Sequence, residues 1–141
     1  MNVKEIMTEN VDLLSPADSL EKASQLMRDD DIGAIPVREG DRLVGMLTDR
    51  DIAVRAVAEG REASSAQVKD AMSSPVLYCY ENDSVEEVGR NMAKNQIRRL
   101  PVLNKEKRLV GMVSLGDLAC KDSGHCAEEA LRVISKPAQP H

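Results

Sequence analysis

The chain contains the same sequence pattern twice. Residues 3–53 align with residues 68–119, without a gap as far as Gly40 and Lys105, after which the second copy carries one extra residue. An internal repeat restricts the architecture strongly, because both copies must form the same structural unit. Two copies are too few for a solenoid. We therefore predict a pseudo-two-fold pair of half-domains that share one core, and the chain length also fits two small lobes packed together.

Composition narrows the possible functions. Each copy, with about 50 residues, would bury too little surface to be stable alone. The chain has two tyrosines and no phenylalanine or tryptophan, so it lacks the aromatic platforms that bind single-stranded nucleic acid. Its net charge of −5 also argues against nucleic acid as a partner.

The location is expected to be cytoplasmic. No apolar run approaches the ~20 residues of a membrane helix, and the first residues show no signal-peptide pattern, so we expect no membrane partner. Three cysteines leave one unpaired, which suits a reducing compartment.

Each copy is predicted to fold in the order short helix, strand, helix, strand, strand, helix. In the first copy, the short helix is Val3–Met7, the first strand is Val11–Leu14, the middle helix starts at Asp18, the next two strands are Ala34–Arg38 and Arg42–Thr48, and the last helix runs from Thr48 to Gly60. In the second copy, the short helix is Val68–Met72, the first strand is Val76–Tyr80, the middle helix starts at Asp83, the next two strands are Leu100–Leu103 and Arg108–Val113, and the last helix starts at Ser114. The two middle helices are expected to begin at a capping box in which Asp18 and Asp83 are the capping residues. The fold class is α/β, with helices packed on one face of each small sheet.

The domain boundaries follow from the repeat. Residues 1–60 form repeat 1, residues 61–67 a polar linker, residues 68–124 repeat 2, and residues 125–141 a flexible C-terminal tail. Each middle helix has an apolar stripe, which we expect to form flat faces for a homodimer. The stripes consist of Leu20, Ala23 and Met27 in the first copy and Val85, Val88 and Met92 in the second.

The motif with the clearest chemistry lies at the end of each repeat. A strand ends at Thr48 or Ser114, and an aspartate follows three residues later at Asp51 or Asp117. This spacing is that of a capping box, which is the favoured interpretation for an isolated motif. The same groups could also bind a ligand, because backbone amides and a hydroxyl can hold a phosphate and a carboxylate can accept from a ribose diol.

The surrounding residues favour the second interpretation. The motif follows Arg-Leu-Val-Gly-Met in both copies, and a strand with the pattern apolar-Pro-Val precedes it, as Ile35-Pro36-Val37 and Leu100-Pro101-Val102. With the Asp-Ser-[Leu/Val] helix start, these features resemble the CBS domain family, named after cystathionine β-synthase. The resemblance covers nearly the whole chain, which is identified as a stand-alone tandem pair, or Bateman module.

The resemblance implies a ligand and a site. The CBS pairs that this chain resembles bind AMP, ADP, ATP or S-adenosylmethionine in clefts between the repeats, and they form disk-like dimers. The resemblance implies the same for this chain. Thr48 and Ser114 would then face phosphate, and Asp51 and Asp117 would face the ribose. The strand residues Ile35, Pro36, Leu100 and Pro101 would flank the adenine, and Ser15 and Tyr80, at matching positions, would line the clefts.

One pair of residues breaks the symmetry of the repeats. Arg98-Arg99 stands where the first copy has Gly33-Ala34. The resemblance implies that an arginine here reaches a phosphate, for which its guanidinium supplies a planar fork of donors. A pair of surface arginines is the alternative. We expect one cleft to prefer phosphorylated ligands and the other to bind weakly or accept adenosine alone.

We therefore expect a non-catalytic regulatory module that binds an adenine nucleotide and signals to an unidentified partner protein by a change of conformation or contacts. The alternative is a structural homodimerisation module without a ligand. We expect no enzyme and no cofactor, because both histidines lie in the last 17 residues and no nucleophile–base spacing is present.

Two other groups are weaker candidates. Cys120, His125 and Cys126, with His141, match no standard zinc spacing, so we expect a mobile polar segment and no metal. Tyr78 and Tyr80 alternate along one strand, so they are predicted to share a face, with one of them buried.

Overall fold

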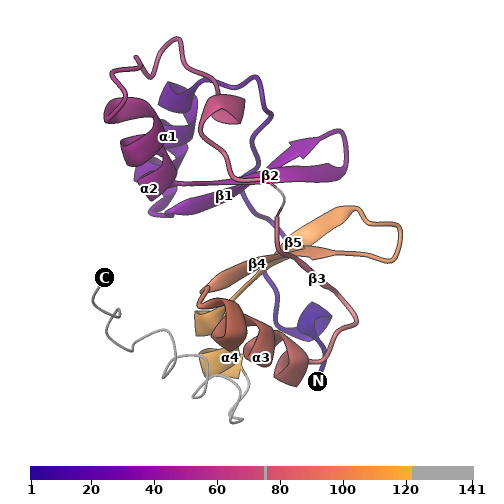
Figure 1. The fold of residues 1–141 in the computed structure, drawn as a ribbon. Helices are drawn as coiled ribbons and strands as arrows, with labels where there is room; N and C mark the ends of the chain where they lie inside the picture. The colour runs from indigo at the N-terminus through magenta and orange to yellow at the C-terminus, as the bar shows by residue number, and fades with distance from the viewer. Residues whose placement is uncertain (75, 122–141) are drawn as a thin grey trace, which may run out of the picture. The chain divides into compact units, whose positions relative to one another are not determined.

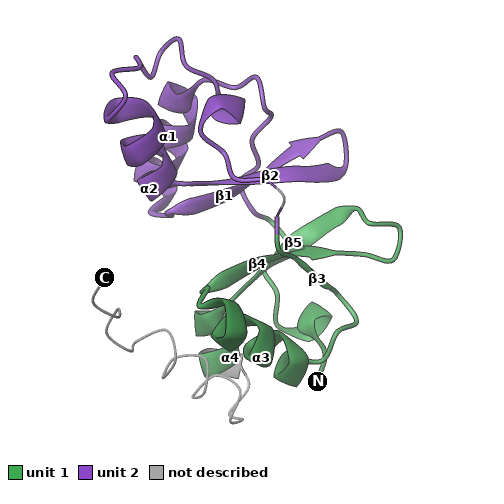
Figure 2. Cartoon of the chain, in the orientation of Figure 1, with its two compact units in different colours: residues 1–10, 77–141 green, residues 11–76 purple. Residues whose placement is uncertain are grey.

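The computed structural model describes residues 1–74 and 76–121, which form two compact units. Unit 1 contains residues 1–10 together with the chain from Leu77 onward, and unit 2 is Val11–Val76 (Figure 2). The buried apolar residues form two clusters, one within each unit. The prediction of a single shared core is therefore wrong, since each unit has a core of its own.

Unit 2 is a two-stranded antiparallel hairpin with helices packed against it. Figure 1 shows α1 and α2 on the same side of the β1–β2 hairpin. Its elements are α1 (Leu20–Asp30), β1 (Ala34–Glu39), β2 (Arg42–Thr48), α2 (Asp49–Ile52), the π-helix η2 (Ala53–Val57) and the 3₁₀ helix η3 (Val68–Asp70). The predicted strand at Val11–Leu14 is reduced to one bridge, between Leu14 and Val37.

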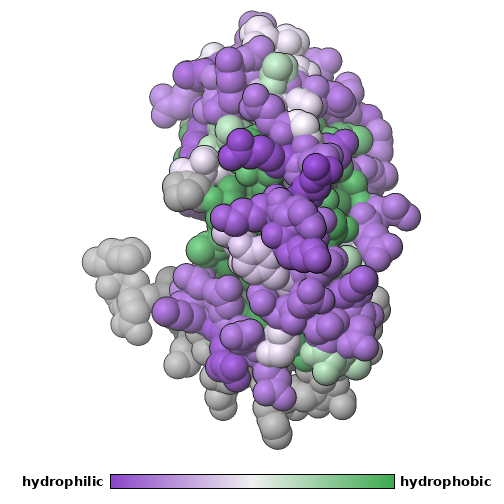
Figure 3. Space-filling view, turned by 90° about the vertical axis from the view of Figure 1, so that its right-hand side faces the viewer, coloured by the Kyte–Doolittle hydropathy of each residue, from purple (hydrophilic) through white to green (hydrophobic). Residues whose placement is uncertain are grey.

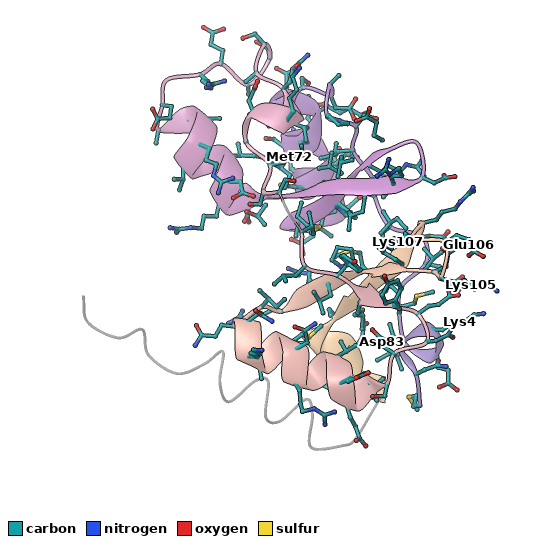
Figure 4. The ribbon with its side chains drawn as sticks, turned by 45° about the vertical axis from the view of Figure 1, so that its right-hand side comes forward. Lys4, Met72, Asp83, Lys105, Glu106 and Lys107 are labelled. Carbon is teal, nitrogen blue, oxygen red and sulfur yellow. The ribbon has the colours of Figure 1, made fainter. Side chains whose placement is uncertain are left out.

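Unit 1 repeats this plan with a third, short strand. Strand β3 runs parallel to β4, which pairs antiparallel with β5. The elements are the 3₁₀ helix η1 (Val3–Glu5), β3 (Cys79–Tyr80), α3 (Val85–Asn95), β4 (Arg99–Leu103), β5 (Leu109–Ser114) and α4 (Leu115–Lys121). Figure 4 shows Lys105, Glu106 and Lys107 at the turn of the β4–β5 hairpin. The predicted fold class, small sheets with helices on one face, is confirmed.

The middle helices begin one residue later than predicted. The capping residues are Ser19 and Ser84, whose hydroxyl oxygens accept from the amides of Lys22 (3.0 Å) and Glu87 (3.1 Å). The preceding Asp18 and Asp83 do not cap the helices. Each carboxylate accepts a hydrogen bond from the amide three residues before it, that of Ser15 at 2.8 Å and that of Tyr80 at 2.9 Å. These bonds fix the turn that leads into each helix.

The opening segment of each repeat packs against the other repeat. The Val3 amide donates to the Asp83 carbonyl at 2.9 Å, and the Val68 amide donates to the Asp18 carbonyl at 2.8 Å. Segment 1–10 therefore completes unit 1, and η3 completes unit 2. The compact units thus differ from the sequence repeats 1–60 and 68–124, because the repeats exchange their first helices.

Residues 61–67, expected as a linker, are part of unit 2. The amides of Leu20 and Glu21 donate to the carbonyls of Ala66 and Ala63, each at 3.0 Å, and Ala66 is buried. This segment therefore covers the start of α1.

The apolar stripes of α1 and α3 face the cores of their own units. Leu20, Ala23 and Met27 belong to the cluster of unit 2, and Val85, Val88 and Met92 to that of unit 1. The prediction that these stripes form a dimer face is therefore wrong, since folding of each unit already buries them.

A glycine in each second strand allows a close approach of the opening segment. A Cβ at Gly111 would lie 2.6 Å from the Thr8 carbonyl oxygen, and one at Gly45 would lie 2.6 Å from the sulfur of Met72, which Figure 4 labels. The segments form bridges here, Thr8 with Met112 and Ser73 with Met46. The glycine of the repeated Leu-Val-Gly motif thus has a packing role.

In the part of the chain that the structure describes, no helix has the length and apolar character needed to cross a membrane. Hydrophilic residues cover much of the outer surface of each unit on the face in Figure 3.

Candidate ligand-binding site

The motif at the end of each repeat forms a complete capping box. In unit 2 the Asp51 amide donates to Thr48 Oγ1 (3.1 Å) and the Thr48 amide to Asp51 Oδ2 (2.9 Å). In unit 1 the corresponding bonds join Ser114 and Asp117 at 3.1 and 2.8 Å. A carboxylate has about four acceptor sites, so this role leaves capacity for a ligand.

The register of the hairpins places Arg99 beside Ser114. These residues are direct partners in the β4–β5 pair, and Ala34 is the partner of Thr48 in the β1–β2 pair. Directly opposed residues in antiparallel strands project from the same face, with Cβ atoms about 5 Å apart. An exposed guanidinium therefore emerges beside the hydroxyl of the unit 1 motif, whereas the matching position in unit 2 has a methyl group.

The predicted adenine-flanking residues have their side chains in the interior. Ile35, Pro36, Leu100 and Pro101 are all buried, and Ile35 and Leu100 belong to the cores of their units. Contact with a ligand at these positions would therefore fall mainly to the main chain.

Ser15 and Tyr80 occupy equivalent turns, as their matching positions in the repeats suggest. Their amides donate to the aspartate three residues later in each unit. Ser15 is exposed and Tyr80 is half-buried.

The two tyrosines lie in edge-to-face contact, with ring centroids 5.6 Å apart. The contact agrees with the prediction that both side chains project from the same face of the chain. The expectation that one is buried is wrong, because Tyr78 is exposed and Tyr80 is only half-buried. A side-chain hydrogen bond with Tyr78 raises the pKa of the Tyr80 hydroxyl.

A cavity of about 370 Å³ in unit 1 involves none of the predicted site residues. Cys79 and Val88 form part of its wall, and charged residues of α3, among them Glu87, Arg90 and Lys94, form much of the rest. Nothing in the sequence signalled it, because charged positions on an amphipathic helix are assigned to solvent. Burial raises the pKa of the Cys79 thiol to about 12, so this thiol is protonated at neutral pH.

Among the described residues, no group of three or more histidine, cysteine, aspartate or glutamate side chains is placed to hold a metal ion. The side chain of Cys120, and His125, Cys126 and His141, lie outside the described part of the structure.

Comparison with known proteins gives consistent matches along both repeats. The CBS domain family model matches residues 3–57 and 68–122. The CBS domain-containing protein YhcV of Bacillus subtilis is 44% identical over 135 residues, which is 95% of each chain. Hypoxic response protein 1 of Mycobacterium tuberculosis is 36% identical over 135 residues, covering 95% of this chain and 94% of the relative.

Solved structures agree with these matches. The crystal structure of Hypoxic Response Protein I with two coordinated zinc ions has a TM-score of 0.79 at 36% identity, covering 86% of this chain and 98% of the other. The CBS domain pair of protein MJ0100, in complex with 5′-methylthioadenosine and S-adenosyl-L-methionine, has a TM-score of 0.74 at 27% identity, covering 84% and 97%.

Proposed function

Because this chain belongs to the CBS domain family, as a tandem pair of CBS domains, we propose that it is a non-catalytic regulatory module for an adenine nucleotide of the AMP, ADP and ATP class. Binding would change the conformation of the chain or its contacts with a regulated partner protein. The adenosyl compounds bound to the CBS pair of MJ0100 support this ligand class.

The observation that carries the proposal is the strand-to-helix junction of unit 1. Arg99 is the register partner of Ser114, and Ser114 shares a capping box with Asp117. One short stretch of surface thus presents a guanidinium and a hydroxyl, which suit phosphate oxygens, and a carboxylate, which suits a ribose diol.

The extent of the matches supports a non-catalytic role. The aligned region covers 95% of YhcV and 94% of Hypoxic response protein 1, so the CBS pair accounts for nearly all of both relatives.

Calorimetry with AMP and adenosine tests the proposal. We expect the wild type to bind both compounds, and Arg99→Ala to weaken AMP about tenfold, with little effect on adenosine, because one charge-assisted contact is lost. The preference for AMP should fade with added salt. Arg90→Ala, at an exposed position of α3, is the matched control.

Thermal denaturation provides an independent measurement. A ligand at a hundredfold excess over its Kd should stabilise the fold by ~2.7 kcal/mol. The proposal fails if AMP, ADP, ATP and adenosine all leave the melting temperature unchanged at millimolar concentration. If Arg99→Ala leaves the AMP-to-adenosine ratio unchanged, the role assigned to Arg99 is wrong.

One observation favours the alternative function, self-association. Val54 and Val57 on η2 are 48% and 66% exposed, in contrast to the buried stripes of α1 and α3. These valines could contact a second copy of the chain whether or not a ligand binds.

A further inference from the structure

The wall of the cavity in unit 1 carries four charged side chains in a definite order. In the direction of α3, Asp83 and Glu87 come first, and Arg90 and Lys94 follow. Figure 4 labels Asp83, which lies just before the start of the helix. The cavity therefore has an acidic end and a basic end, which correspond to the two ends of α3.

These charges are not neutralised within the described structure. Glu87, Arg90 and Lys94 form no ion pair or side-chain hydrogen bond with any other described residue. Arg90 and Lys94 are four residues apart, a spacing at which like charges on a helix repel. The helix dipole favours acids at the start and bases at the end of a helix, so it explains the order of the signs but leaves this repulsion in place. An occupant with opposite charges would remove the repulsion.

The equivalent face of unit 2 is neutralised by its own residues. Lys22 of α1 stands at the position that Glu87 has in α3. Its ammonium lies 3.3 Å from the carboxylate of Asp18, the counterpart of Asp83. The same backbone plan therefore forms an ion pair in unit 2 and places two carboxylates one helical turn apart in unit 1.

The sequence that follows α4 has the complementary charges. Residues 125–141, expected as a flexible tail, lie outside the described part of the structure. In this sequence Glu128 and Glu129 are followed, at spacings of three to four residues, by Arg132 and Lys136. At such spacings side chains share one face of a helix. Acids precede bases here as they do along α3, so an antiparallel alignment would set the acids of each segment opposite the bases of the other.

Apolar residues alternate with these charges. Ala127, Leu131 and Ile134 stand at positions i, i+4 and i+7, which form one stripe of an amphipathic helix. Cys79 and Val88 provide an apolar part of the cavity wall. A segment with an apolar stripe between charges matches this wall, whereas a small free ion would leave it in contact with water.

The length of the chain after α4 permits this contact within one chain. The Leu115 amide donates to the Arg98 carbonyl at 2.8 Å, so α4 begins beside the end of α3, and Figure 1 shows the two helices next to each other. Helix α4 ends at Lys121. When extended, residues 122–127 can span about 20 Å, more than the ~16 Å length of the 11-residue α3. Residue 128 can therefore reach either end of α3.

We infer that residues 128–136 bind across the cavity of unit 1 in the same chain, antiparallel to α3. The acids of this segment contact Arg90 and Lys94, its bases contact Asp83 and Glu87, and its apolar stripe covers the cavity wall. This contact is separate from the strand-to-helix motif of the proposed function, and it does not depend on that function.

NMR relaxation of the full chain tests the inference. In the wild type we expect backbone order parameters of about 0.85 for residues 128–136, as in a rigid segment. Reversal of the acids by Glu128→Lys with Glu129→Lys should lower them to below about 0.6. Arg90→Glu with Lys94→Glu should release the segment in the same way. All four substitutions together set opposite charges against each other again, and we expect them to restore the order.

Arg38→Glu with Arg42→Glu is the matched control. Both arginines are exposed in unit 2, and the change in net charge equals that of the α3 variant, so the segment should stay ordered. Unchanged amide chemical shifts of the β4–β5 hairpin establish that each variant is folded. Low order parameters in the wild type would overturn the inference, as would order that no charge reversal lowers or that the combined variant fails to restore. Order that appears only as the protein concentration rises would assign the segment to a second copy and overturn the contact within one chain.

Discussion

At the scale of single residues, Gly111 is the position where a small change should cost most. An alanine Cβ would lie 2.6 Å from the Thr8 carbonyl oxygen, a main-chain atom that can move only with its segment. We expect Gly111→Ala to reduce the free energy of unfolding by about 2–3 kcal/mol, as overpacking of a rigid site does. Denaturation with urea measures this loss.

Two other glycines are matched controls. The Cβ of Gly45→Ala would first meet the sulfur of Met72, the end of a flexible side chain, so the loss there should be smaller. At Gly116 the nearest atom lies at 3.5 Å, an ordinary contact, and alanine should be neutral or slightly stabilising in a helix. Equal losses at all three positions would contradict the close-approach argument.

Cys79 should make stability depend on alkaline pH. Burial, with a contribution from the Asp83 carboxylate, raises the pKa of its thiol from 9.0 to about 12. The folded state then holds this proton where the unfolded state has lost it. The stabilisation is therefore complete below about pH 9 and is lost as the pH rises toward 12.

The expected loss is at most about 1.4 kcal/mol per pH unit in this window. Urea denaturation between pH 9 and 11 should show a steeper decline for the wild type than for Cys79→Ser, whose hydroxyl does not titrate there. Tyrosines and lysines titrate in both proteins, so the difference in slope isolates the thiol. Equal slopes of stability against pH in the wild type and Cys79→Ser would contradict a contribution from the thiol.

At the scale of elements, the capping boxes have a structural and a proposed ligand role, which one variant can separate. Asp117→Ala removes an acceptor for the Ser114 amide, and we expect a loss of about 1 kcal/mol in stability. If the carboxylate also binds the ribose, nucleotide affinity should fall by a further ~1.5–3 kcal/mol. Calorimetry on the folded variant measures the second quantity.

Ser84→Ala is the matched control for this experiment. It removes the cap of α3 and should cost a similar stability, with unchanged affinity. A variant Asp117→Ala that melts lower but binds with wild-type affinity would leave the aspartate a capping role alone.

Local patterns predicted most elements, because turns, caps and hairpins depend on neighbours in the sequence. Both hairpins and the six predicted helix starts agree with the structure to within a few residues, but the helix predicted from Thr48 to Gly60 is divided into α2 and η2. The sequence predicts Asp18 as the cap, since an Asp-x-x-Glu spacing resembles a capping box, but Ser19 is the residue whose hydroxyl accepts from the amide of Lys22. The strand predicted at residues 11–14 is reduced to one bridge, because strand pairing depends on a partner distant in the sequence, here Val37.

At the scale of the whole molecule, the exchange of opening helices could not be predicted from the repeat. Both segments begin with Val-Lys, and Val3 and Val68 make equivalent bonds to the aspartates at positions 83 and 18. Equivalent sequences fit either repeat, so periodicity alone does not decide which one a segment completes. The candidate site shows the same limit, because the capping box follows from residue spacing, whereas the pairing of Arg99 with Ser114 follows from the register of two strands.

Self-association also belongs to the scale of the whole molecule. Because the apolar stripes of α1 and α3 are buried within their own units, we now expect the dimer contact on η2. Val54 and Val57 both lie on η2, and both are exposed. Burying the exposed part of these side chains against a second copy would contribute about 1–2 kcal/mol for each valine, because part of each is already buried within unit 2. We expect a homodimer at tens of micromolar in sedimentation, and a monomer for the double variant Val54→Asp, Val57→Asp.

The control Ser64→Asp, Ser65→Asp adds the same charges at exposed positions of unit 2 and should remain dimeric. A wild type that stays monomeric with and without AMP would contradict the dimer, and a dimer that survives both valine substitutions would place its interface elsewhere.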